Sequence, residues 1–253
     1  MSSCCGVGSG GAESERRRKA IKLLVVGLDA ASYKWASLFR GYLPTLGSLM
    51  DSCLSGPLET VPPPTTSVGW PALFQGLNPA KSRSFCFSRE IKDYRMQFFS
   101  RADFLVGDTV WDILSREGYR CFVMNVPMTY PAKPLNGALI CSFDSTGPKW
   151  TYPDDAKREC IQMGFRPKEK SIGDFKTYGD WFDYWIERET LVKDVALHFI
   201  DELQPDFAFV TFLMLDRLGH RFAVKDPIAY RMAYAAIDKI VGDLIAKAAP
   251  EHF

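Results

Sequence analysis

The sequence has almost no net charge: 31 lysines and arginines are matched by 30 aspartates and glutamates, which leaves +1 over 253 residues. A chain without excess positive charge has no long-range field to attract a polyanion, so we expect neither a nucleic-acid polymer nor an anionic membrane surface as partner. The chain also lacks any apolar run near the ~20 residues of a transmembrane helix, so no membrane span is expected. An anionic ligand must be held locally.

Several familiar motifs are absent as well. No GxxxxGK(S/T), HExxH or GxSxG pattern occurs, which removes the usual support for a P-loop enzyme, a zincin or a lipase-like hydrolase. The seven cysteines are an odd number without a CxxC spacing, unlike a disulfide framework or a zinc knuckle. The region Arg16–Leu28 has no cleavage site typical of a signal peptide. We therefore expect reduced thiols and a cytoplasmic location.

The composition that is present indicates a folded chain. Hydrophobic residues make up 47% and aromatic residues 13% of the sequence, which is enough to bury a large core. Residues 1–19 are rich in Ser, Gly and Cys and are predicted to be a disordered tail. Residues 20–253 are predicted to form one domain, and the charged stretch at about 145–180 is predicted to be a peripheral insert.

Strand-like and helix-like segments alternate along this domain. Apolar runs typical of strands are Ile21–Leu28, Leu58–Val61, Cys121–Val126, Leu139–Cys141 and Phe207–Leu215. Helices are predicted at Tyr33–Phe39, Leu43–Leu54, Gly69–Gln75, Thr109–Glu117, Tyr178–Leu203 and Tyr230–Ala248. The alternation predicts an α/β fold, a three-layer sandwich with a mainly parallel central sheet. Ligands of such sheets gather beyond the carboxyl ends of the strands, where we place Asp29, Thr66 and Asp216.

Asp216 and His220 are four residues apart and directly follow a predicted buried strand. If this segment is helical, both side chains lie on one face, close enough to hold one cation. Aspartate with histidine suits zinc, manganese or iron better than calcium. The alternative is that Asp216 caps a helix and His220 packs at its surface, and the pentapeptide alone does not decide between them.

Asp29 and Thr66 are the other candidates for chemistry. A carboxylate at the end of an apolar strand is expensive to bury unless a cation, an arginine or a helix N-terminus faces it, although Asp29 could also cap the next helix. Thr66 precedes a predicted helix start, which suits an anion and a transferring phosphoryl group. Its hydroxyl needs a metal or a base to become a nucleophile, so its role depends on Asp29 and Asp216. Otherwise this stretch is a capped turn.

Five segments, taken in order, resemble the alkaline phosphatase superfamily, in its type I phosphodiesterase/nucleotide pyrophosphatase branch. They are GLDAA at 27–31, LPTL at 43–46, PPPTTSVGWPALFQGLNP at 62–79, NVPMTYPAKPLNG at 125–137 and DRLGH at 216–220. The resemblance covers roughly residues 20–253. It implies a site for two divalent metal ions, usually zinc, in which Asp29 binds one ion and Asp216 and His220 bind the other.

The resemblance also implies a nucleophile. It points to Thr66, as a metal-bound alkoxide that attacks a phosphodiester or pyrophosphate bond and gives a phosphoenzyme, with Thr65 and Ser67 as competitors. The implied substrate is a small phosphorylated molecule such as a nucleotide. The sequence departs from the family at Lys81-Ser82-Arg83, where Lys/Ser-His-Gly is usual, and at Gln75, which replaces a common threonine. These departures concern substrate preference.

Another departure concerns the metals. The family continues with a strand ending in Asp-His-Gly and with a later histidine ligand, which this sequence does not contain before Phe253. We expect the C-terminal part of the fold to be missing and catalysis to be incomplete in this chain. The alternatives are a catalytically inactive interaction protein on the same scaffold, and a phosphomonoesterase or phosphotransferase of the superfamily.

Overall fold

The structure, a computed structural model, describes residues 20–86, 88–91, 95–98 and 105–248, and the tail predicted for residues 1–19 lies outside these ranges. Its strands are β1 (Leu23–Leu28), β2 (Ser88–Ile91), β3 (Arg95–Phe98), β4 (Cys121–Met124), β5 (Gly137–Ile140), β6 (Thr151–Tyr152) and β7 (Phe207–Phe212). Its α-helices are α1 (Tyr33–Phe39), α2 (Pro44–Ser52), α3 (Thr66–Gln75), α4 (Pro79–Ser82), α5 (Val110–Arg116), α6 (Ala156–Gln162), α7 (Tyr178–Leu203), α8 (Met214–Phe222) and α9 (Pro227–Ala248). Short 3-10 helices are η1 (Arg40–Tyr42) and η3 (Ile172–Asp174).

Five strands form the main sheet in the order β1-β7-β4-β5-β6. β1, β7, β4 and β5 are parallel, and β6 pairs antiparallel with β5. Every residue of β4 and β7 is buried, as expected of parallel strands covered on both faces. The register pairs Leu28, at the end of β1, with Phe212, at the end of β7. The residues that follow these two strands therefore emerge side by side at one edge of the sheet.

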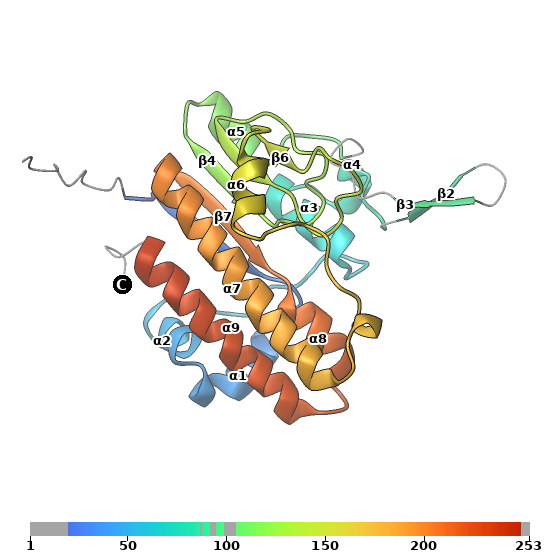
Figure 1. Ribbon diagram of the computed structural model, residues 1–253, viewed down its shortest axis with the longest axis vertical. Coiled ribbons are helices and arrows are strands. Elements are labelled where there is room, and N and C mark those ends of the chain that lie inside the picture. The colour runs from blue at the N-terminus through green and yellow to red at the C-terminus, as the bar shows by residue number, and fades with distance from the viewer. Residues whose placement is uncertain (1–19, 87, 92–94, 99–104, 249–253) are drawn as a thin grey trace, which may run out of the picture.

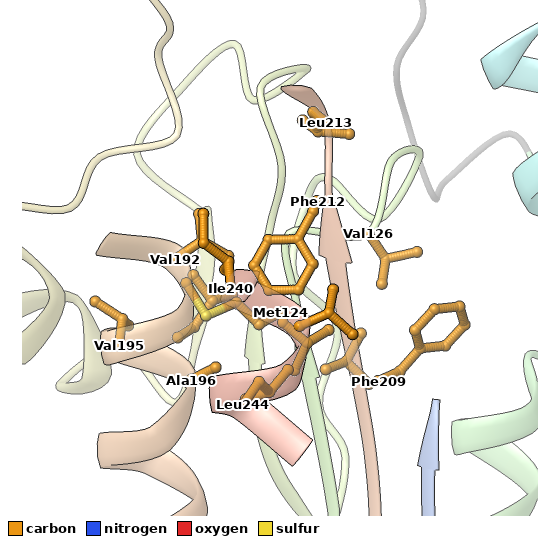
Figure 2. Close-up of a cluster of buried hydrophobic side chains, with 14 of the residues drawn as sticks. Met124, Val126, Val192, Val195, Ala196, Phe209, Phe212, Leu213, Ile240 and Leu244 are labelled. Carbon is orange, nitrogen blue, oxygen red and sulfur yellow. The ribbon is translucent and has the colours of Figure 1, made fainter. Parts of the chain in front are cut away.

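Helices cover both faces of this sheet, which confirms the predicted α/β fold with a mainly parallel sheet. α7 and α9 pack against each other across one face (Figure 1). In Figure 2, Phe212 of β7 points toward these two helices, whereas Phe209 points to the opposite side. On that side the ring of Phe209 lies 6.1 Å from Trp70 of α3 and 6.2 Å from Trp111 of α5. β7 is thus the centre of the core on both faces.

Helix α3 begins at Thr66, three residues before the predicted start at Gly69, and carries Pro71 in its interior. Proline has no N–H to donate to the carbonyl four residues earlier, which here belongs to Ser67. The hydroxyl of Ser84 donates a short hydrogen bond to that carbonyl instead. The helix therefore accommodates the proline, and Thr66 becomes its first residue.

The predicted strand at Leu58–Val61 is wrong, because the structure has no regular element there. Pro57 and Pro62 flank this segment, and neither can donate a hydrogen bond to a neighbouring strand. The side chain of Leu58 is also 86% exposed, so no burial favours a strand.

The predicted strand Phe207–Leu215 ends at Phe212, and α8 begins two residues later. The backbone N–H groups of Leu213 and Met214 donate to Oε1 of Glu189, both at 2.6 Å. Glu189 belongs to α7 and is buried. Its carboxylate accepts the hydrogen bonds of N–H groups that would otherwise extend the strand, so Asp216 lies in the first turn of a helix and not at a strand end.

Residues 145–180, predicted to be a peripheral insert, contribute the edge strand β6 to the main sheet. They also form α6, whose Ala156 and Cys160 are buried. β2 and β3 form a separate antiparallel ribbon that projects from the domain (Figure 1).

Candidate active site

Asp29 directly follows β1 and is only 6% exposed. Its backbone N–H donates to the carbonyl of Phe212 at 2.9 Å, so the parallel ladder continues up to the site. The indole Nε1 of Trp70 donates to Oδ1 of Asp29 at 2.9 Å, and the hydroxyl of Thr66 donates to Oδ2 at 3.3 Å. Both carboxylate oxygens therefore have a donor, as a buried charge requires.

The electrostatic environment of Asp29 opposes its ionisation. Burial raises the pKa of Asp29 from 3.8 to about 6, and the negative charge of nearby Asp216 adds to this rise. The hydrogen bond from Trp70, the positive charge of Arg217 and the hydrogen bond from Thr66 act in the opposite direction. A divalent cation between the two carboxylates would relieve both causes of the raised pKa.

The structure separates Thr66 from its two neighbouring competitors. Thr65 is the exposed N-cap residue of α3, and its Oγ1 lies 3.3 Å from Oγ of Ser67. Ser67 is only 1% exposed. Thr66 is half-buried, and its hydroxyl contacts Asp29. Of the three hydroxyl groups, that of Thr66 thus combines access with a contact to a candidate metal ligand.

Asp216 and His220 lie one turn apart on α8, as their spacing predicts for a helix. Nε2 of His220 is 3.4 Å from Oδ1 of Asp216. The side chain of Asp216 is 14% exposed and that of His220 is 79% exposed. The structure thus brings Asp29, Thr66 and Asp216 together, with His220 at the solvent side, while their roles as ligands and nucleophile remain predictions.

Sequence reasoning missed Trp70 as a partner of Asp29. A Cβ on Gly27 would lie 2.5 Å from the Trp70 ring and 2.9 Å from Oγ1 of Thr211. Glycine at this position of β1 therefore lets the indole cross the strand and reach the carboxylate. The signal in the sequence is weak, since it consists only of a glycine two residues before Asp29 and a tryptophan four residues after Thr66.

Sequence reasoning also missed Arg217 and Glu169. Arg217 follows Asp216 directly, and its NH1 group contacts Oδ2 of Asp216, while its Nε donates to Oε2 of Glu169 at 2.9 Å. Glu169 comes from the loop between α6 and η3. Nothing in the sequence pairs a glutamate of this loop with α8, because only the tertiary fold brings them together.

The donor types of this site fit a divalent cation of the kind that binds carboxylate and imidazole groups. Asp29, Asp216 and His220 supply two carboxylates and one imidazole, and Thr66 supplies a hydroxyl beside them. Within the described part of the chain, however, no three His, Cys, Asp or Glu side chains lie close enough together to hold a metal ion. The residues present therefore fit part of a metal shell.

The α/β fold with a mainly parallel sheet matches that of structures of the alkaline phosphatase superfamily. More particularly, the chain belongs to the type I phosphodiesterase/nucleotide pyrophosphatase family, whose profile matches residues 23–253. The resemblance noted in the sequence is confirmed by this match. Members of the family are typically metal-dependent.

Solved structures show the same fold. Phosphonoacetate hydrolase from Sinorhizobium meliloti 1021, in complex with phosphonoacetate, matches with a TM-score of 0.59 at 16% identity, over 90% of this chain and 54% of its own. Murine ectonucleotide pyrophosphatase/phosphodiesterase 5 matches with a TM-score of 0.57 at 16% identity, over 90% of this chain and 53% of its own. An inactive form of the murine protein in complex with AMP matches with a TM-score of 0.58 at 14% identity, over 91% and 53% of the two chains.

The chain thus spans about half the length of these structures. Comparison with curated proteins gives no significant match. Among the described helices, none has the length and apolar character needed to cross a membrane.

Proposed function

We propose that this chain carries the phosphoryl-transfer site of a metal-dependent hydrolase of phosphodiester or pyrophosphate bonds, with Thr66 as nucleophile. The observation that carries the proposal is the hydrogen bond from the Thr66 hydroxyl to Asp29, at the point where α3 begins. Family membership supports the class of reaction. The AMP complex of the murine relative supports a nucleotide or another small phosphodiester as substrate.

The chemistry follows from the residues of this chain. The Thr66 oxygen attacks phosphorus and forms a new P–O bond, while the bond from phosphorus to the leaving oxygen breaks and that oxygen takes a proton from water. The Asp29 carboxylate, which accepts the Thr66 hydrogen bond, takes the hydroxyl proton. Because Thr66 is the first residue of α3, the N-terminal end of this helix would favour the developing negative charge. The hydroxide left by that water attacks the phosphorylated Thr66 and breaks its bond to phosphorus, which releases phosphate or a phosphomonoester, and Asp29 returns its proton to the Thr66 oxygen.

The proposed ligands are Asp29, Thr66, Asp216 and His220, for two divalent ions with zinc preferred over manganese or iron. A cation held there would lower the pKa of the Thr66 hydroxyl and offset the negative charge of the transferring group. The raised pKa of Asp29 supports this assignment, because burial and the negative charge of Asp216 both disfavour its charged form and a cation would favour it. The cytoplasmic location remains a prediction.

The test is hydrolysis of a bis-aryl phosphodiester by the purified chain with Zn²⁺ or Mn²⁺, compared among wild type, Thr66→Ala and the neighbouring control Thr65→Ala. Whatever turnover the wild-type chain shows, we expect Thr66→Ala to abolish it and Thr65→Ala to retain it. Intact-protein mass after brief incubation should show a phosphorylated fraction in wild type that Thr66→Ala lacks. Turnover without metal, or turnover unaffected by Thr66→Ala, contradicts the mechanism.

A second candidate is a catalytically inactive interaction protein on the same scaffold. The observation in its favour is that the described residues contain no group of three or more metal-ligating side chains. This candidate predicts no metal uptake by wild type and no change in any ligand-binding property after Asp216→Ala. Metal uptake that Asp216→Ala removes would exclude it.

A further inference from the structure

Arg217 lies between two carboxylates from different parts of the chain. Its NH1 group contacts Oδ2 of Asp216, and its Nε donates to Oε2 of Glu169 at 2.9 Å. The guanidinium also lies over the ring of Phe143, 4.3 Å from the ring centre. Contacts with two carboxylates and one ring fix the planar group in one orientation, a geometry that lysine cannot reproduce.

The ion pair between Arg217 and Glu169 is largely removed from solvent. The side chain of Arg217 is 21% exposed and that of Glu169 is 13% exposed. Oε1 of Glu169 is buried and has no hydrogen-bond partner among the described residues. An ion pair in such surroundings keeps its geometry better than a surface pair, since water does not compete for its hydrogen bonds.

The contacts divide the two oxygens of Asp216 between two neighbours. Oδ2 faces Arg217, whereas Oδ1 faces Nε2 of His220 at 3.4 Å. The rotation of the carboxylate is therefore set by Arg217, and the oxygen that Arg217 does not contact is the one beside the exposed imidazole. A cation approaching from solvent meets Oδ1 and the imidazole together.

We propose that Glu169 and Arg217 are positioning residues that hold the Asp216 carboxylate in the orientation required to bind a divalent cation together with His220. This inference rests on the proposed function, in which Asp216 and His220 are metal ligands. Hydrogen-bonded partners of metal ligands orient them, and their loss commonly weakens metal binding by 10–100-fold. Asp29, Asp216 and Glu169 together outnumber Arg217 and Arg188, the two guanidinium groups that act on Glu169, so the site retains net negative charge for a cation.

The experiment is calorimetric titration of Mn²⁺ and of Zn²⁺ into the purified chain, with wild type, Arg217→Gln, Glu169→Gln and Asp216→Ala compared. The matched control is Arg221→Gln, because Arg221 is on the same helix and also stacks on a ring, that of Tyr178. We expect about tenfold or weaker binding for Arg217→Gln, a smaller loss for Glu169→Gln, and no change for Arg221→Gln. The double variant should lose less than the two single losses combined, because the residues act through one another.

Two further readouts separate positioning from a merely structural role. Arg217→Lys keeps the charge but not the planar fork, so it should restore folding stability without restoring metal affinity in full. The visible absorption of the Co²⁺-loaded protein should change in Arg217→Gln and not in Arg221→Gln, because it reports the ligand geometry.

Unchanged or tighter metal binding in both Arg217→Gln and Glu169→Gln overturns the inference. If Asp216→Ala abolishes binding while those variants retain it, the proposed function stands and the positioning role falls. If Asp216→Ala has no effect, or if wild type binds neither ion, the metal site itself falls and the inference falls with it. Thermal unfolding without metal identifies any variant that fails to fold. If Arg217→Gln fails to fold, the metal affinity of Glu169→Gln, the milder change, tests the positioning role.

Discussion

The indole Nε1 of Trp70 donates a 2.9 Å hydrogen bond to Oδ1 of Asp29, although the two residues are 41 positions apart in the sequence. The ring reaches the carboxylate by lying against Gly27, where any other residue would place a Cβ 2.5 Å from it. A buried carboxylate at the edge of a sheet is thus stabilised by a side chain of the helix that begins with Thr66. Two predictions test this relationship.

Trp70→Phe should destabilise the protein by roughly 2 kcal/mol more than loss of ring area accounts for, because it removes a hydrogen bond to a buried charged group. The matched control is Trp185→Phe, since Trp185 is also buried but its Nε1 has no hydrogen-bond partner among the described residues. The measurement is urea unfolding at pH 4 and at pH 8. The difference between the two variants should grow with pH, because Asp29, whose pKa is about 6, becomes charged over this interval. Equal destabilisation by the two variants at pH 8 would refute the prediction.

Gly27→Ala should destabilise the protein by about 1–3 kcal/mol, because the added methyl group overlaps the Trp70 ring and crowds Thr211. Gly41→Ala is the control, since a Cβ at Gly41 meets nothing within 4 Å. Chemical unfolding and near-ultraviolet circular dichroism, which reports the packing of tryptophan, measure the effect. A Gly27→Ala protein as stable as wild type, with an unchanged tryptophan signal, would show that the indole does not depend on this glycine.

The raised pKa of the buried Glu189 carboxyl group predicts that the stability of the protein depends on pH. Burial raises its pKa from 4.5 to about 7, against the opposing hydrogen bonds from Leu213 and Met214. Between pH 4.5 and about pH 7, Glu189 binds more protons in the folded state than in the unfolded state. The free energy of unfolding therefore falls as pH rises, and the loss is complete above about pH 7. The contribution is on the order of 3 kcal/mol at about 1.4 kcal/mol per pKa unit.

Glu189→Gln keeps an oxygen for the two N–H groups but carries no charge, so it should flatten this part of the stability profile between pH 4.5 and 8. Glu187→Gln, at an exposed position on the same helix, should leave the profile unchanged. Urea unfolding at intervals of half a pH unit measures both variants. A profile for Glu189→Gln that is as steep as that of wild type would contradict the assignment.

Asp238 should be a strong determinant of stability. It is fully buried on α9, and its two carboxylate oxygens accept the N–H groups of Thr45 and Leu46, at 3.0 and 2.7 Å, at the start of α2. Asp238→Ala should cost about 2–4 kcal/mol, because it removes a helix cap and leaves buried donors without an acceptor. Asp238→Asn should cost less, and Lys239→Ala, at an exposed position, should cost little. Thermal and urea unfolding measure the series, and a loss below 1 kcal/mol for Asp238→Ala would contradict the prediction.

The parts of the fold that depend on local pattern were predictable. The bounds of α1 and α7 agree with the sequence prediction, because hydrophobic periodicity marks both helices and Thr177 with Asp180 forms a capping box at the start of α7. The end of β7 was not predictable, since it is decided by the carboxylate of Glu189 on a distant helix. No local propensity carries that information.

The candidate site also contains some residues that the sequence predicted and others that it did not. The sequence predicted that Asp29, Thr66 and Asp216 lie near one another, from their place at the ends of elements, and that His220 lies beside Asp216, from their spacing; the roles of these four residues remain predictions. Trp70, Arg217 and Glu169 were not predicted, because their importance lies in tertiary contacts with those residues. The start of α3 was misplaced for a related reason, since the Ser84 hydroxyl that satisfies the carbonyl opposite Pro71 comes from outside the helix.

The position of β1 in the sheet bears on how the protein is made. Within the described residues, β1 pairs with β7 alone, and β7 lies near the other end of the sequence. A ribosome that adds 5–20 residues per second needs roughly ten seconds or longer to deliver the partner of β1 after β1 itself has emerged. During that interval the apolar strand β1 has no partner strand, and such long-range pairing is intrinsically slow. The β1–β7 part of the sheet can therefore form only after β7 has left the ribosome.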